Sequence, residues 1–342
     1  MRNRQLFSGL LFFSIFFLVF APLFLKTANA QNGLPPSPVI SAMAWNSEGT
    51  LLATGHFSGM VRIWDAATRE VIFEFEGGGS EGITSVTWQP GGSLLAAGNY
   101  DGSIRIWDTE TGELFDTLLP NQGWISGLVW TLDGSSLVFI MGETPNFHLW
   151  NLDTDQLSDR GNTRGAAQMA WRSDGTLLAT ANPTGVEIMD AATLQPVVGF
   201  QNPEPVGRGG DVYSVAWHPG GKLVAGGSLN GSVRLWDIET GEMVDEFRGN
   251  YYPIMGGFET SVFGLHFSAD GTQLTSVSAD GTIRTWEVET GRVLADVQAE
   301  ERISAAAWSE DGCWLAYGIN TANRAKPDED RDLFSLMSFC AS

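Results

Sequence analysis

The chain has 342 residues, of which 43% are hydrophobic and only 17% are charged, so disorder over most of its length is excluded. It carries 19 Lys and Arg against 40 Asp and Glu, for a formal net charge of −21 at pH 7. An acidic surface of this kind repels phosphate backbones and anionic membranes, which argues against nucleic acid as a partner. The simplest reason for the acidity is solubility.

The first 30 residues are typical of an export signal. Arg2 and Arg4 precede an apolar run over residues 6–25, and Ala28-Asn29-Ala30 follows. A basic head, an apolar middle and an A-x-A tail predict a signal peptide over residues 1–30. The alternative is an uncleaved membrane anchor, because the run is long enough to span a bilayer of about 30 Å. Both readings predict an extracytoplasmic location: secreted, periplasmic or at the cell envelope.

From residue 38 onward the sequence repeats one unit. Each copy begins with an apolar run that starts near residue 40, 83, 125, 166, 212, 262 or 303 and ends in an aromatic residue. Those residues are Trp45, Trp88, Trp130, Trp171, Trp217, Phe267 and Trp308. They lie 43, 42, 41, 46, 50 and 41 residues apart, and this period predicts a radial or stacked repeat architecture that forms one body.

The fifth copy shows the repeated unit most plainly. Four apolar or β-branched runs occupy residues 212–217, 222–228, 232–236 and 242–247, with tight turns such as Asn230-Gly231 between them. Turns of this type accept positive φ and match the strand twist, so each unit is expected to be a four-stranded antiparallel meander. One meander cannot bury both faces alone, so the copies are expected to pack around an axis.

The third strand of each copy resembles the signature of the WD-repeat β-propeller family. Val233-Arg234-Leu235-Trp236-Asp237 and Ile104-Arg105-Ile106-Trp107-Asp108 match it closely. The resemblance implies an all-β, seven-bladed propeller over residues 38–342 and, with the signal segment, an exported protein of bacterial type. It also implies that a set of structural tryptophans wedges between the sheets: Trp64, Trp107, Trp150, Trp236 and Trp286.

The chain departs from the family pattern in two places. No copy has the Gly-His that the family often places before its first strand, so the blade-stabilising network of that histidine is not expected. The fourth copy ends its third strand with Met189-Asp190 in place of Trp-Asp. In four copies, Arg62, Arg105, Arg234 and Arg284 share one register, which indicates a scaffold role rather than a binding site.

The seventh copy is irregular over residues 320–342 and has no fourth strand. In WD-repeat propellers an amino-terminal segment supplies this strand, and here it would be residues 31–37, whose Pro35 and Pro36 fit only an edge position. Cys313 and Cys340 fall at neighbouring ends of two antiparallel strands, which predicts a disulfide. The alternative is two isolated thiols.

Motifs for catalysis and metal binding fail on their context. Gly78-Gly79-Ser80-Glu81-Gly82 matches G-x-S-x-G, yet no helix follows it. Asp328, Asp330 and Asp332 alternate as in a calcium loop, but Leu333 replaces the required Gly. We therefore expect no enzyme activity, no metal and no cofactor.

Two insertions predict the recognition face of the propeller. They occupy residues 201–210 and 249–259, between a fourth strand and the next first strand. Aromatic and Met side chains on loops are typical of binding hot spots. The residues predicted to bind a partner are Tyr251, Tyr252, Met255, Phe258 and Arg208. The alternative is a local cap over the blade edge, and Trp124, near the same face, is interpreted as a core residue.

These features favour a non-catalytic scaffold outside the cytoplasm that binds a protein or peptide through the face with the long loops. We expect a monomer that contacts a membrane only through an uncleaved amino-terminal segment. One alternative is an extracytoplasmic propeller hydrolase or lyase with its site at the central channel, where His266 is the single acidic residue or histidine on the first strands. Another is a purely structural repeat protein with no partner.

Overall fold

The computed structural model describes residues 39–77, 82–119, 123–142, 146–162, 166, 168–203, 211–248, 260–319 and 334–340. The predicted signal segment 1–30, and the segment 31–37 predicted to close the ring, lie outside these ranges. Within the described part, no helix combines the length and apolar character needed to cross a bilayer.

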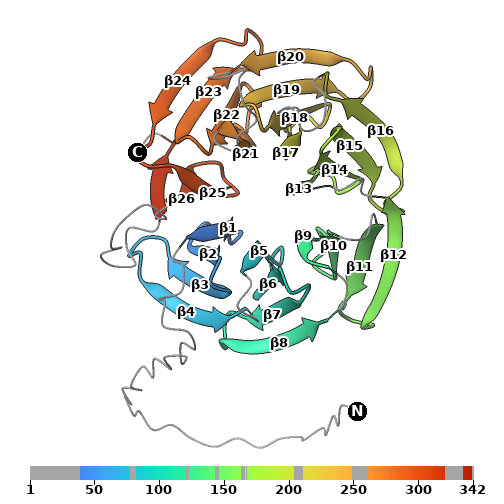
Figure 1. Ribbon diagram of the computed structural model, residues 1–342, viewed down its shortest axis with the longest axis vertical. Coiled ribbons are helices and arrows are strands. Elements are labelled where there is room, and N and C mark those ends of the chain that lie inside the picture. Colours follow the sequence, from blue (N-terminus) through green and yellow to red (C-terminus); the bar gives the residue numbers. More distant parts are fainter. Residues whose placement is uncertain are drawn as a thin grey trace, which may run out of the picture. The chain divides into compact units, whose positions relative to one another are not determined.

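The described strands form seven antiparallel sheets, or blades, around a central channel (Figure 1). Blade 1 contains β1 (Ile40–Trp45), β2 (Leu51–His56), β3 (Met60–Asp65) and β4 (Val71–Glu76). Blade 2 contains β5 (Ile83–Trp88), β6 (Leu94–Asn99), β7 (Ile104–Asp108) and β8 (Glu113–Leu118). Blade 3 contains β9 (Ile125–Trp130), β10 (Ser136–Met141), β11 (Asn146–Asn151) and β12 (Gln156–Asn162).

The remaining blades follow the same order. Blade 4 contains β13 (Gln168–Trp171), β14 (Leu177–Asn182), β15 (Gly185–Asp190) and β16 (Pro196–Gln201). Blade 5 contains β17 (Val212–Trp217), β18 (Leu223–Ser228), β19 (Ser232–Asp237) and β20 (Met243–Arg248). Blade 6 contains β21 (Val262–Phe267), β22 (Gln273–Ser278), β23 (Thr282–Glu287) and β24 (Val293–Gln298), and blade 7 contains β25 (Ile303–Trp308), β26 (Trp314–Ile319) and β27 (Phe334–Ser338).

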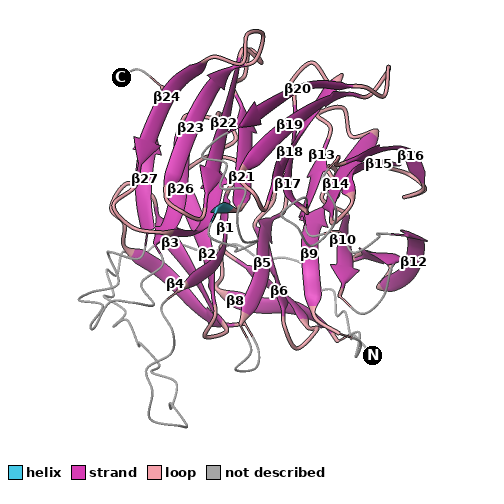
Figure 2. Cartoon of the chain, turned by 45° about the horizontal axis from the view of Figure 1, so that its top comes forward, coloured by secondary structure: helices cyan, strands magenta, loops and turns pink. Residues whose placement is uncertain are grey.

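The ring closes between the first and the last blade. The first strand of each blade lines the channel and the fourth lies outermost, and neighbouring sheets stack face to face (Figure 2). β1 contacts β5 on one side and β25 on the other. The predicted all-β, seven-bladed propeller is therefore confirmed, with four strands in six blades and three described strands in blade 7.

Tryptophans of the third strands fill the spaces between blades. Trp64, Trp107, Trp150, Trp236 and Trp286 are only 1–3% exposed. Trp107 stacks on Phe75 of the preceding blade, with ring centroids 5.1 Å apart, and Trp64 meets Phe334 of blade 7 at 5.2 Å. In blade 4, Met189 is fully buried at the corresponding position. In blade 7, Met337 stands at the same register position, so the wedge is a tryptophan in five blades and a methionine in two.

Blade 1 rebuilds part of the polar network that the missing Gly-His would supply. Trp64 Nε1 donates to Thr54 Oγ1 at 2.8 Å, and that hydroxyl lies 3.0 Å from His56 Nε2. All three side chains are buried, so these bonds are made away from water. The histidine comes from the end of β2 instead of from the residue before β1.

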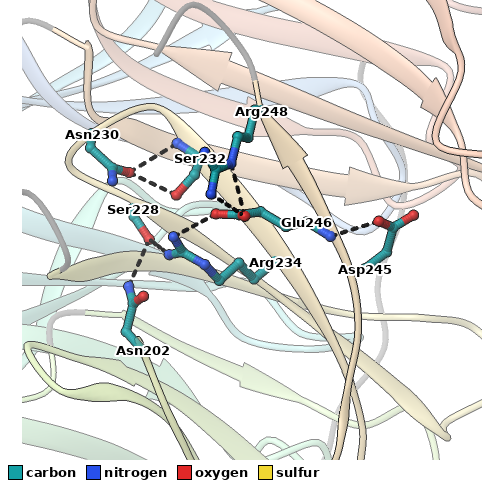
Figure 3. Close-up of polar contacts among 8 residues, drawn as sticks. All are labelled: Asn202, Ser228, Asn230, Ser232, Arg234, Asp245, Glu246 and Arg248. Carbon is teal, nitrogen blue, oxygen red and sulfur yellow. Dashed lines mark hydrogen bonds and ion pairs between the residues drawn. The ribbon is translucent and has the colours of Figure 1, made fainter. Parts of the chain in front are cut away.

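Three of the four arginines of shared register pair with the outer strand. Arg62 and Arg284 meet Glu74 and Asp296 at 2.7 and 2.5 Å. In blade 5, Arg234 is fully buried and its Nη2 lies 2.7 Å from Glu246 Oε1. Figure 3 shows the surrounding bonds, which extend to blade 4 because Asn202 Nδ2 donates to Ser228 Oγ at 3.2 Å. The group drawn there comprises Asn202, Ser228, Asn230, Ser232, Arg234, Asp245, Glu246 and Arg248.

A disulfide joins the last two strands of blade 7. Cys313 and Cys340 are bonded, with Cα atoms 5.0 Å apart, and Phe339 N donates to Cys313 O at 2.8 Å beside the bond. The polar stretch between β26 and β27, residues 320–333, lies outside the described residues. The bond thus holds β27, which faces Trp64 of blade 1 through Phe334, against β26.

Candidate recognition face

The two long insertions connect strands whose described ends lie on one face of the ring. One joins β16 to β17 and the other joins β20 to β21, and these strand ends lie on the face where first strands begin and second strands end. We call this the recognition face. Most of both loops lies outside the described residues, and with it Arg208, Tyr251, Tyr252, Met255 and Phe258. Their role in binding stays a prediction.

Three described aromatic side chains stand exposed on the same face. Phe57, Tyr100 and Trp124 are 47%, 46% and 40% exposed. They line one cavity of about 360 Å³, whose floor includes Ile83 and Met141. We call these three residues the aromatic rim. The interpretation of Trp124 as a core residue is wrong, because the side chain is presented to solvent at the mouth of this cavity.

Backbone hydrogen bonds fix the aromatic rim to the blades. Phe57 and Tyr100 directly follow β2 and β6, and their N–H groups donate at 3.1 Å to Val39 O and Gly82 O, just before β1 and β5. In blade 3 the exposed aromatic residue accepts this bond instead of donating it. Gly142, directly after β10, donates its N–H to the carbonyl of Trp124, directly before β9, at 2.8 Å. The same bond therefore positions all three side chains.

The absence of a side chain at Gly142 allows the Trp124 indole to pack against the backbone there. A Cβ added to Gly142 would lie 2.1 Å from Cε2 of that indole, far inside van der Waals contact. The ring thus lies directly over the glycine backbone. A larger residue at position 142 would displace the indole from the cavity mouth.

The corresponding positions in other blades carry no aromatic residue. The same backbone bond joins Leu229 to Asp211 in blade 5 and Ala279 to Ser261 in blade 6. A feature of the scaffold would recur in most blades, as the buried third-strand tryptophans do in five of the seven. The aromatic rim is confined to blades 1–3, and this unequal use is the pattern expected of a binding site.

The opposite face carries a regular belt of aromatic residues at the ends of the first strands. In five blades the indole N–H donates to a backbone carbonyl of the preceding blade, at 2.7 to 3.2 Å. The donors are Trp45, Trp88, Trp130, Trp171 and Trp217. The bond from Trp45 reaches Ala307 O, so the belt also joins blade 1 to blade 7.

The belt is interrupted at two junctions, between blades 5 and 6 and between blades 6 and 7. Phe267 has no N–H to donate, and Nε1 of Trp308 is buried without a hydrogen-bond partner in the described part of the chain. Trp308 instead stacks on His266, with ring centroids 4.7 Å apart. Burial lowers the pKa of His266 to about 4, against a smaller opposing effect of Asp311, so the imidazole is neutral at pH 7.

The central channel offers little to the enzyme alternative. A cavity of about 330 Å³ lies within it, lined by the first strands. Ser41, Thr84, Ser126 and Ser304 supply hydroxyl groups, and none of the described residues that line it is Asp, Glu, His, Lys or Arg. Ser41 Oγ donates to Ile83 O of the next blade at 2.5 Å, so this hydroxyl serves the joint between blades. His266 lies away from this cavity, on the belt face beside Asp311.

Comparisons with known proteins identify the repeats. The WD domain, G-beta repeat model matches residues 34–65, 69–108 and 204–237. The anaphase-promoting complex subunit 4 WD40 domain model matches residues 255–311. Both kinds of match fall on the repeats that were recognised from their tryptophans and turns.

The curated relatives are eukaryotic and are matched over part of their length. WD repeat-containing protein SL1-17 of Schistosoma mansoni is 30% identical over 131 residues, 37% of this chain and 39% of its own. Eukaryotic translation initiation factor 3 subunit I of Aspergillus terreus is 32% identical over 117 residues, 34% of this chain and 31% of its own. Periodic tryptophan protein 2 homolog of Schizosaccharomyces pombe is 28% identical over 123 residues, 34% of this chain and 14% of its own.

These relatives contradict the predicted location. They are intracellular eukaryotic proteins, a translation initiation factor subunit among them, so the prediction of an extracytoplasmic protein is wrong. The expectation of an exported protein of bacterial type finds no support in them either. Both expectations came from the composition of residues 1–30. What the repeats, the closed ring and the family matches establish together is that the chain is a seven-bladed β-propeller that contains WD40 repeats.

Proposed function

We propose that the protein is a non-catalytic interaction platform that binds a protein or peptide partner on its recognition face. The observation that carries the proposal is the aromatic rim: three exposed aromatic side chains from three blades line one cavity. Aromatic residues around a concave site dominate the binding energy of many interfaces. The insertions 201–210 and 249–259, which connect strands that end on the same face, would extend the contact through Tyr251, Tyr252, Met255, Phe258 and Arg208.

Two further features support binding over catalysis. Backbone hydrogen bonds fix the chain at all three rim positions, and the Trp124 indole packs against Gly142, so the backbone of the site is already ordered before a partner binds. Among the relatives, the translation initiation factor 3 protein is by its name a subunit of a larger assembly. A WD40 propeller related to such subunits is expected to act through contacts with other proteins.

Site-specific crosslinking tests the proposal. A photoreactive phenylalanine analogue is placed at position 57 of the full chain, expressed in its native cells, and irradiated. The matched control carries the analogue at Phe115, which is 45% exposed on the outer strand β8. We expect a defined crosslinked partner from position 57 that is absent from position 115 and is lost when Trp124→Ala is added.

The same experiment can contradict the proposal. Identical products from both positions, or products unchanged by Trp124→Ala, would show that the aromatic rim is not the binding site. A crosslinked product of twice the mass of the chain would show that the protein associates with itself, and the expectation of a monomer would then be wrong. Circular dichroism melting of each variant confirms that the ring is folded.

A further inference from the structure

We infer that a cavity on the belt face binds an arginine side chain of a protein partner. The inference goes beyond the proposed function, because this cavity lies on the face opposite to the aromatic rim. It is carried by three observations: two belt hydrogen bonds that are not made, the charge of the lining residues, and an acid that no other blade has at its position.

The cavity lies where the first strands of blades 4–7 end. Its volume is about 460 Å³, within the range of about 300–1,000 Å³ that is typical of ligand sites. Trp171, Trp217 and Phe267 line it, together with residues of the turns that follow these strands. Every turn between a first and a second strand lies in the described part of the chain. The surroundings of the cavity on this face are therefore known residue by residue.

Two hydrogen bonds of the belt are missing at this cavity. In four of the five belt bonds, the indole reaches the carbonyl of the residue just before the corresponding aromatic residue of the preceding blade. For Phe267 and Trp308 those carbonyls belong to Ala216 and His266, and both residues line the cavity. Phe267 has no N–H, and Nε1 of Trp308 has no partner in the described part of the chain, so neither bond is made. A guanidinium, with five N–H donors, supplies the kind of group that is missing there.

The charge of the lining favours a cation. The lining includes Glu310 and Asp311, and none of its described residues is Lys or Arg. Oδ1 of Asp311 accepts hydrogen bonds from Ser309 Oγ at 2.5 Å and Cys313 N at 2.9 Å, and these bonds hold the pKa of that carboxyl below its usual range. His266 adds no positive charge at pH 7, because burial keeps its imidazole neutral. The cavity therefore attracts a cation and repels an anion.

An arginine suits this lining better than an aliphatic side chain. An apolar occupant would remove water from the two carboxylates without giving them a partner, which costs free energy. A guanidinium also stacks on aromatic rings. The chain already contains one such contact, since Cζ of Arg172 lies 5.8 Å from the ring centroid of Trp217. That guanidinium is paired with Asp174 at 2.8 Å, so its charge is already balanced.

Glu310 is the acid that distinguishes this cavity from the rest of the belt face. It stands two places after the aromatic residue that ends the first strand, and the other six copies have no acid there. Those residues are Ser47, Pro90, Leu132, Ser173, Pro219 and Ala269. Asp311, by contrast, has counterparts in three other turns that accept the same backbone bond: Asp133, Asp174 and Asp270. Glu310 is therefore the residue that the test changes.

Peptide-linked arginine fits the cavity better than the free amino acid. The α-carboxylate of free arginine would approach Glu310 and Asp311, whereas an arginine within a peptide carries no such charge. The test therefore titrates the full chain with a capped Gly-Arg-Gly peptide and follows the indole N–H signals by NMR. Saturable shifts are expected for Trp308, and none for Trp45 at the junction of blades 7 and 1.

Two variants of the peptide separate charge from hydrogen bonding. Citrulline in place of arginine keeps the planar end and its N–H donors but carries no charge, and norleucine lacks both. We expect affinity to fall about tenfold from arginine to citrulline, and further with norleucine. Equal binding of the arginine and norleucine peptides, tighter binding of free arginine, or no shift at Trp308 overturns the inference.

Matched variants of the chain test the role of the acid. Glu310→Gln is expected to weaken the arginine peptide about fivefold and to leave the citrulline peptide unchanged. The control is Glu48→Gln, because Glu48 is exposed in the corresponding turn of blade 1 and does not line the cavity. Equal effects of the two variants also overturn the inference. Crosslinking at position 57 reports on the opposite face, so the proposed function stands or fails separately.

Discussion

The two faces of the propeller use aromatic residues in opposite ways. On the belt face, Trp45, Trp88, Trp130, Trp171 and Trp217 repeat one contact from blade to blade and hold the ring together. On the recognition face, Phe57, Tyr100 and Trp124 stand at comparable places in only three blades and are 40–47% exposed. Repetition thus marks the residues that build a radial fold, and an unrepeated aromatic at a repeated position marks a candidate for recognition.

The largest effect is expected where the repetition is buried. Trp236 is 2% exposed and stacks on Phe200 of the preceding blade, so Trp236→Ala should lower the free energy of unfolding by about 3–5 kcal/mol. Urea denaturation followed by circular dichroism measures this loss. The exposed Phe115→Ala, as control, should change it by about 0.5 kcal/mol or less. Similar losses of unfolding free energy in the two variants would contradict the claim that the repeated, buried aromatic residues hold the ring together.

The interruption of the belt should be sensitive to pH. The pKa of His266 is about 4 in the folded chain and 6.5 as its ordinary value, so between these pH values the unfolded chain binds more protons. The free energy of unfolding should therefore fall by up to ~3 kcal/mol as the pH drops from 6.5 to 4. Denaturation of the wild type and of His266→Phe at several pH values measures the difference. An identical pH dependence in both proteins would show that the His266 imidazole does not cause the loss of stability at low pH.

Closure of blade 7 gives a prediction of intermediate size. Residues 31–37 are proposed to pair with the side of β27 that faces away from β26, so their deletion should lower the melting temperature by several degrees, equivalent to roughly 1–2 kcal/mol. Replacement of the same residues by a Gly-Ser segment of equal length is the control for chain length. An unchanged melting temperature after deletion would show that the ring closes without them.

The smallest effect is expected for one bond of the belt. Trp88→Phe keeps an aromatic ring but removes the indole N–H that donates to Ala44 O. The free energy of unfolding should fall by about 1 kcal/mol. Trp308→Phe is the matched control, because Nε1 of Trp308 has no partner in the described part of the chain. Denaturation should show a smaller loss for position 308. Equal losses would mean that ring size, not the hydrogen bond, sets the contribution of the belt.

The architecture could be predicted from the sequence because the regular spacing of the repeated residues determines it. The seven aromatic marks and the Gly-containing turns fall at strand ends, so the number of blades follows from their count. The aromatic rim could not be found in this way. Its members occupy two different places in the repeat, after the second strand in Phe57 and Tyr100 and before the first strand in Trp124. Only the backbone hydrogen bond between the residue after the second strand and the residue before the first strand shows that these two positions are neighbours.

A signal for the rim was nevertheless present in the sequence. The residue after the second strand is aromatic in copies 1 and 2, but Leu229 and Ala279 stand there in copies 5 and 6. An alignment of the seven copies against one another would have shown this contrast. Location could not be reached by such reasoning, since an apolar segment ahead of a domain resembles an export signal by composition alone.

The most direct test of the distinction between the two faces is the triple variant Phe57→Ala, Tyr100→Ala, Trp124→Ala, measured for both stability and partner binding. We predict a free energy of unfolding within about 1.5 kcal/mol of the wild type and a loss of affinity of more than tenfold for the partner captured at position 57. Full affinity in the folded triple variant, or unfolding as severe as in Trp236→Ala, would contradict the assignment of these three residues to recognition.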